Sequence, residues 1–132
     1  MRGYLAVTPD ELAQLITDGE LDIETAFVPT GSFKRANPDL GEEESEYILS
    51  LLAADDSLSY QGDAAKFTFA LAVDLEASQI GTETEVEVTL TAPIKFSQAD
   101  CLFVGEAEAE DGELTWYAAQ EIAANLPNWL DK

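Results

Sequence analysis

Residues 66–91 read KFTFALAVDLEASQIGTETEVEVTLT, and this stretch decides the fold class of the chain. Two runs within it, 67–74 and 85–90, alternate between apolar residues and residues that are small, polar or charged. Because successive side chains of a β-strand point to opposite faces of the sheet, an alternation with period two predicts a strand. The two runs therefore predict a pair of adjacent antiparallel strands in the middle of a sheet.

Helices are predicted on both sides of this stretch along the chain. Thr8 stands three residues before Glu11, a spacing that is typical of a capped helix start, and Gly19 is a typical helix stop. Apolar residues three and four positions apart predict a long helix at 42–58 and a C-terminal helix at 114–126. The sequence thus predicts three helices.

Shorter apolar segments at 2–7, 26–28 and 101–104 predict three further strands, which makes about five in all. The length of 132 residues is that of one domain. We therefore predict a single α+β domain, residues 1–132, with a mainly antiparallel sheet and helices packed on one of its faces.

The charge balance limits the partners that the chain can bind. There are 27 acidic and 6 basic residues and no histidine, which gives a formal net charge of −21. Phosphate contacts need Lys and Arg, so the composition argues against direct binding to nucleic acid or to an anionic membrane. A basic protein is the macromolecule that such a field attracts, although the same charge also keeps a protein in solution. No stretch resembles a signal peptide or a membrane span, which predicts a cytoplasmic protein.

The familiar catalytic and metal-binding patterns are missing from the sequence. Without histidine there is no histidine-assisted nucleophile, and one cysteine without histidine makes no zinc site. No glycine-rich phosphate loop occurs, and residues 106–113 lack the spacing of a calcium loop. Cys101 lies in the apolar run 101–104 and is predicted to be structural. We predict no catalytic residue, no metal ligand and no cofactor, and the balance leans against an enzyme.

Acidic residues gather in two segments, the first turns of the long helix and the loop that follows the last strand. Their carboxylates are the predicted partner-binding residues: Glu42, Glu43, Glu44, Glu46, Glu106, Glu108, Glu110 and Asp111. Carboxylates in a first helical turn also stabilise the helix through its dipole, so the first group has a structural role as well.

Three segments resemble an uncharacterised family of short acidic actinobacterial proteins. They read MRGYL at 1–5, GEEESEY at 41–47 and ELTWYAAQEI at 113–122. The resemblance implies a small cytoplasmic bacterial protein and carries no activity with it. Within the last segment, Trp116 and Tyr117 are a candidate ligand platform, because an aromatic pair offers large contact surfaces.

The leading hypothesis is a non-enzymatic domain that binds a basic macromolecule through its acidic face. A carboxylate-based or metal-dependent enzyme is the first alternative, and a pocket with carboxylates beside Trp116 or Tyr117 would favour it. A nucleic-acid mimic that inhibits a DNA-binding protein is the second. It is suggested by Glu83, Glu85 and Glu87, which would repeat at about 6.6 Å on one strand face, near the spacing of phosphates. The oligomeric state is left open.

Overall fold

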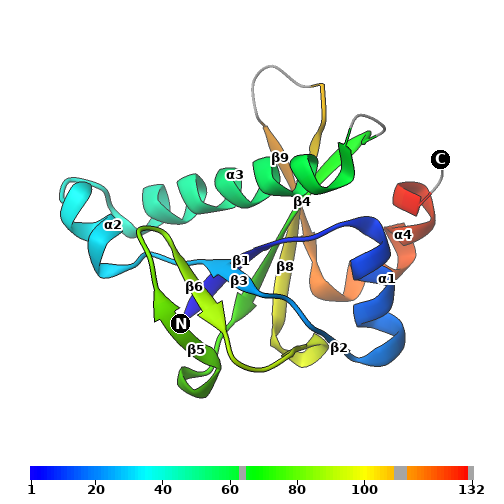
Figure 1. Cartoon of the computed structure of the whole chain (residues 1–132). Coiled ribbons are helices and arrows are strands. Elements are labelled where there is room, and N and C mark those ends of the chain that lie inside the picture. Colours follow the sequence, from blue (N-terminus) through cyan, green and yellow to red (C-terminus); the bar gives the residue numbers. More distant parts are fainter. Residues whose placement is uncertain (63–64, 109–112, 131–132) are drawn as a thin grey trace.

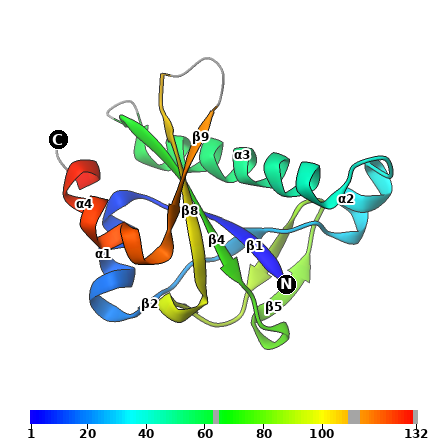
Figure 2. The same cartoon turned by 180° about the vertical axis from the view of Figure 1, so that it is seen from behind.

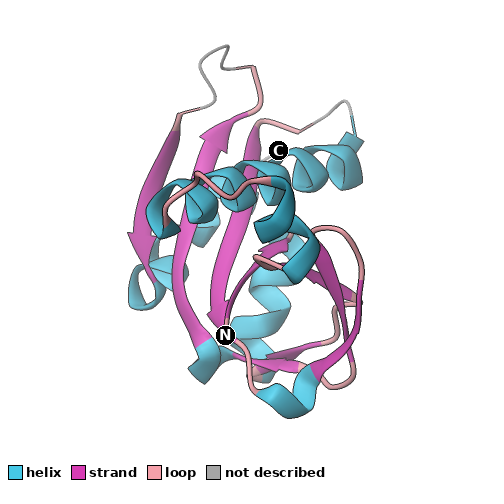
Figure 3. Cartoon of the chain, turned by 90° about the vertical axis from the view of Figure 1, so that its left-hand side faces the viewer, coloured by secondary structure: helices cyan, strands magenta, loops and turns pink. Residues whose placement is uncertain are grey.

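The computed structural model describes residues 1–62, 65–108 and 113–130, and these form an α+β domain (Figure 1). Within them, seven antiparallel strands make the main sheet, in the order β5-β6-β3-β1-β4-β8-β9. The strands, in sheet order, are Ile80–Glu83 (β5), Glu87–Leu90 (β6), Thr25–Phe27 (β3), Arg2–Ala6 (β1), Phe67–Asp74 (β4), Ala99–Glu106 (β8) and Leu114–Ala118 (β9). They are twisted and curved (Figure 3). Strands β2 (Glu20–Leu21) and β7 (Ile94–Lys95) form a separate two-stranded sheet.

Four α-helices accompany the strands in the described part of the chain: Pro9–Asp18 (α1), Gly31–Ala36 (α2), Glu42–Gln61 (α3) and Ile122–Leu130 (α4). Short 3₁₀ turns occur at Ala77–Gln79, Phe96–Gln98 and Ala119–Glu121. The α+β class is confirmed, but the predicted five strands and three helices were too few. Strands β2 and β7 and helix α2 are too short to leave a periodic signal in the sequence.

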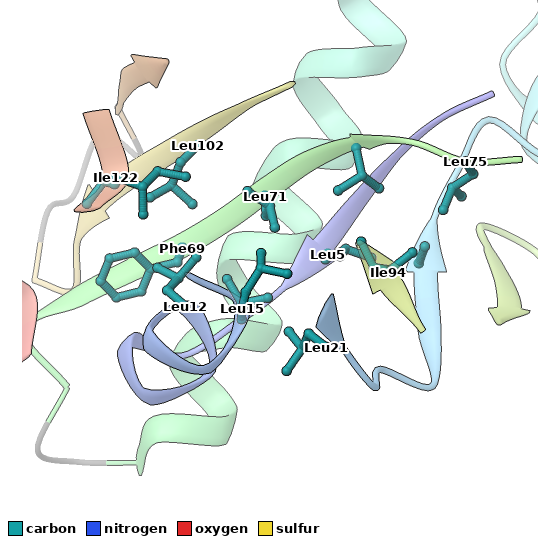
Figure 4. Close-up of a cluster of buried hydrophobic side chains, with 14 of the residues drawn as sticks. Leu5, Leu12, Leu15, Leu21, Phe69, Leu71, Leu75, Ile94, Leu102 and Ile122 are labelled. Atoms are coloured by element: carbon teal, nitrogen blue, oxygen red, sulfur yellow. The ribbon is translucent and has the colours of Figure 1, made fainter. Parts of the chain in front are cut away.

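Strand β4 is buried on both faces, because its two sets of side chains meet different helices. Phe69, Leu71 and Val73 are fully buried in a core that they share with residues of α1 and α4 (Figure 4). Ala70 and Ala72 are also fully buried, in a second core under α3. The prediction that helices cover one face was wrong: the alanine face is not solvated, because small side chains leave room for a helix.

The two runs that predicted adjacent strands do form strands, but not neighbours. Strands β1 and β3 lie between β4 and β6, and β6 pairs with β5 and β3 instead. The predicted row of carboxylates is also not formed, since Glu83 ends β5 and Glu87 begins β6. Glu83 accepts a hydrogen bond from the Gly31 amide at 2.8 Å. The observation that suggested a nucleic-acid mimic is therefore lost.

The two ends of the chain differ in how well the sequence predicted them. The capped start of α1 is confirmed: the Thr8 hydroxyl accepts from the Glu11 amide at 3.2 Å, and Gly19 ends the helix at φ 80°. The C-terminal helix predicted at 114–126 was wrong, because residues 114–118 form β9 on the edge of β8. Helix α4 starts only at Ile122 and includes Pro127, and it packs beside α1 (Figures 1 and 2).

None of the helices in the described part of the chain has the length and apolar character that a membrane span requires.

Helix α3 crosses the sheet over strands β1 and β4 (Figure 1). Its buried side chains are mostly small: Leu49, Ser50, Ala53, Ala54 and Ser57. Tyr47, which precedes these residues on the helix, is 53% exposed. The helix therefore packs on the sheet between Leu49 and Ser57, and the glutamates of its first turn, Glu42–Glu44, are exposed.

Candidate functional site

Arg2, at the start of β1, joins two strands of the sheet to α3. Its Nε donates to the Tyr4 hydroxyl at 3.1 Å, its Nη1 to Asp100 Oδ2 at 2.7 Å and its Nη2 to Cys101 Sγ at 3.3 Å. Glu46 Oε1 lies 4.0 Å from the same Nε, and the guanidinium is 5.7 Å from the centre of the Tyr4 ring. These contacts hold the guanidinium of Arg2 beside the carboxylates of Asp100 and Glu46.

Two cavities border on Arg2, Tyr4 and Glu46, and we call the pair the α3 groove. The smaller, the aromatic cavity, measures about 220 Å³ and lies between α3 and β8. Besides the three shared residues it is lined mainly by Glu43, Tyr47, Phe103 and Leu114. The larger cavity measures about 480 Å³ and reaches from α3 to α2. It is lined, among others, by Lys34, Asn37, Leu40, Glu42 and Ser45.

Three of the four acidic residues predicted at the start of the long helix lie in this groove. Glu43 and Glu46 line the aromatic cavity, and Glu42 and Glu46 line the larger one. Glu44 instead accepts a hydrogen bond from the Gly41 amide at 3.4 Å, which makes it part of the helix start. The structure thus divides this acidic block into two roles.

The second acidic group lies elsewhere. Glu106, at the end of β8, lines a different cavity of about 400 Å³ together with Glu113 and Tyr117. Glu108 is exposed in the turn that follows. Glu110 and Asp111 lie outside the described residues. The structure does not bring Glu106 and Glu108 to the α3 groove.

Trp116 and Tyr117 do not form one platform, because neighbours on a strand point to opposite faces. Trp116 is 56% exposed and lies directly opposite Phe103, on the face that carries α3. Tyr117 lies on the other face and packs edge-on against Trp129, with ring centres 5.2 Å apart. Only Trp116 belongs to the surroundings of the groove. It also contacts the thiol of Cys101.

The nucleophilic groups of this region are held in their neutral forms. Burial raises the pKa of the Cys101 thiol and of the Tyr4 hydroxyl, and the guanidinium of Arg2 offsets this only in part. Arg2 therefore keeps its positive charge beside a thiol and a phenol that stay protonated at neutral pH. In the described part of the chain, no three acidic or cysteine side chains gather closely enough to hold a metal ion.

The sequence did not predict that Arg2, Lys34, Tyr47 and Phe103 line the groove together with the acidic block. Arg2 contacts Asp100, which is 98 positions away, so no local pattern announces the pair. The scarcity of basic residues was the one available signal, since Arg2 and Lys34 are two of only six.

A family model described as "Family of unknown function (DUF6912)" matches residues 1–112. The chain belongs to this family. Neither a curated protein nor a solved structure matches the chain. The predicted resemblance to an uncharacterised family is confirmed, although the quoted segment 113–122 lies beyond the matched residues. The match includes α2, α3 and Arg2, and the family brings no activity to the groove.

Proposed function

We propose that the protein is a cytoplasmic, non-enzymatic domain that binds a basic protein partner through the carboxylates and aromatic rings of the α3 groove. The observation that supports this proposal best is the composition of the aromatic cavity. Glu43 and Glu46 provide negative charge, and Tyr47 and Phe103 provide ring surfaces. A cationic side chain gains from both, through charge-assisted hydrogen bonds and through cation–π attraction.

The size of the aromatic cavity fits this role. Sites for small molecules usually measure about 300–1,000 Å³, whereas this cavity measures about 220 Å³. It therefore suits one long side chain of a larger partner. The exposed side chains of Tyr47 and Trp116 are both near Phe103: Tyr47 lines the same cavity, and Trp116 is its partner on the neighbouring strand. Exposed aromatic residues of this kind are typical anchors of protein interfaces.

The proposal is tested with labelled peptides of seven residues that contain a single Arg or Lys in a glycine and serine background. Binding is measured by fluorescence anisotropy at physiological salt, where unspecific charge attraction is screened. The variant Glu43→Gln/Glu46→Gln is expected to lose at least about tenfold in affinity, since a charge-assisted hydrogen bond contributes about 1.5–3 kcal/mol.

A matched control separates the groove from the overall charge. The variant Asp55→Asn/Glu85→Gln removes the same two charges from exposed positions outside the groove and should bind as the parent does. Equal losses of affinity in both variants would mean that the peptide responds only to the net charge of the protein, and the proposal would fail. It would also fail if no basic peptide binds the parent protein at physiological salt.

A carboxylate-based enzyme is a second candidate, favoured by one observation. The cavity of about 400 Å³ places Glu106 and Glu113 beside Tyr117, the arrangement that we associated with this alternative. A magnesium or manganese titration followed by thermal unfolding tests it. A stabilisation that is lost in Glu106→Gln would favour the enzyme, and no response in the parent protein would count against a metal-dependent one.

A further inference from the structure

The larger cavity of the α3 groove contains positive charge that the acidic hypothesis does not explain. Lys34, on α2, and Arg2 both line it, although the whole chain has only six basic residues. Across the described residues, the ammonium group of Lys34 takes part in no hydrogen bond and no ion pair. A guanidinium also has more N–H groups than the three contacts of Arg2 use. The cavity thus offers hydrogen-bond donors of positive charge.

Carboxylates lie in the same cavity. Glu42 and Glu46 line it together with Lys34 and Arg2, and the hydroxyl of Ser45 is a further polar group. A ligand with only negative charge would meet these carboxylates and the field of a chain with net charge −21. A ligand with only positive charge would meet Lys34 and Arg2. The lining is therefore complementary to a ligand that carries both charges.

The position of the two cavities says how these charges should be arranged. Both border on Arg2, Tyr4 and Glu46, so the two cavities are neighbours, and a ligand that occupies both lies against these three side chains. The aromatic cavity suits the cationic end, as argued above. The donors of Lys34 and Arg2 then lie where a carboxylate of the same ligand would bind, because carboxylates pair with ammonium and guanidinium groups.

We propose that the α3 groove recognises a lysine or arginine residue with a free α-carboxylate, either as the C-terminal residue of a protein or as the free amino acid. The basic side chain enters the aromatic cavity between Tyr47 and Phe103. The α-carboxylate binds Lys34 and the unused N–H groups of Arg2. This inference rests on the proposed function, because it adds a carboxylate to the basic side chain proposed there.

The test compares one peptide in three forms: ending in Arg with a free carboxylate, ending in Arg with an amide, and with the Arg in an internal position. Affinities are measured by anisotropy at physiological salt, and free arginine is titrated by calorimetry. The free carboxylate form is expected to bind at least about tenfold more tightly than the amide, as one charge-assisted pair allows. Free arginine that binds as tightly as the peptide identifies the amino acid as the ligand, and much weaker binding identifies a chain end.

Lys34→Met should reduce the ratio of the affinities for the carboxylate and amide forms, because only Arg2 then remains to pair with the α-carboxylate. Lys95→Met is the control, since Lys95 is exposed on β7 and lines neither cavity. If the three peptide forms bind equally and Glu43→Gln/Glu46→Gln still weakens them, the inference is wrong and the proposed function stands. If no form binds, the proposed function fails as well.

Discussion

Substitution of Ser57 by alanine is expected to destabilise the domain far more than its size suggests. Ser57 lies on the buried side of α3, with no exposed surface. Its hydroxyl donates to the Val7 carbonyl at 2.6 Å and accepts from the Phe69 amide at 3.0 Å, and it also accepts from Gln61 Nε2 at 3.1 Å. It therefore supplies the hydrogen-bond partner of backbone groups from β4 and from the residue after β1.

The magnitude follows from what the substitution leaves behind. A buried backbone group without a partner costs about 1–3 kcal/mol, and Val7 and Phe69 are both fully buried. The better helix propensity of alanine returns only about 0.5 kcal/mol. With two such groups, we expect Ser57→Ala to lower the free energy of unfolding by about 1.5–5.5 kcal/mol, which is a large part of the stability of a small domain.

Ser50→Ala is a matched control in the same helix. Ser50 is 2% exposed, and its hydroxyl donates at 2.6 Å to the carbonyl of Tyr47, one turn earlier. That carbonyl lies inside the helix and keeps its backbone partner, so a loss below about 1 kcal/mol is expected. Urea unfolding followed by circular dichroism should separate the two midpoints by about 1 M. Equal midpoints would show that the Ser57 hydroxyl does not hold α3 to the sheet in the way argued.

Two further predictions concern titratable groups. Cys101 is 3% exposed, and burial raises the pKa of its thiol. The folded protein should therefore not react with a disulfide reagent at pH 8 within minutes, whereas the urea-unfolded chain should react fully. Fast reaction of the folded protein would contradict the burial of Cys101. Burial, and to a smaller extent the charge of Asp56, raise the pKa of Glu87. The folded state therefore binds the Glu87 proton more tightly than the unfolded state does. Stability falls as the pH rises from the pKa of Glu87 in the unfolded state to its higher pKa in the folded state. Glu87→Gln should therefore raise the urea midpoint at pH 7 and not below pH 4. An equal rise at both pH values would contradict this argument.

The parts of the fold that the sequence predicted are those that local chemistry decides. The cap of α1 depends on Thr8, Glu11 and Gly19, which lie within one short segment. Strand β4 was predicted because its alternation is long and regular. In both cases the interactions that create the pattern are either within the segment or common to any sheet.

The parts that the sequence did not predict depend on contacts between distant segments. Residues 114–118 have apolar spacing that also fits a helix, and only the free edge of β8 makes them a strand. The alternation of β4 identifies a strand but not its partners, so β1 could not be placed beside it in advance. Ala70 and Ala72 are buried because α3 packs over them, and no pattern within β4 predicts that a helix covers this face.

The same distinction applies to the candidate site. The acidic block at the start of α3 was visible in the sequence, and three of its carboxylates do lie in the groove. The other residues that line the groove come from other elements: Arg2 from β1, Lys34 from α2 and Phe103 from β8. Their convergence is a product of the fold.

The net charge and the groove act on different steps of the proposed recognition. A field of −21 charges attracts any basic partner, and salt weakens this attraction beyond about 8 Å. It therefore speeds association without telling one basic partner from another. Discrimination requires groups in the site that a wrong ligand would leave unpaired. In the groove these groups are Lys34 in the larger cavity and Glu43 in the aromatic cavity. An internal lysine would leave Lys34 without a carboxylate, and an acidic chain end would place no cation beside Glu43. For this reason the two basic residues, rather than the many acidic ones, are the part of the site that would choose the ligand.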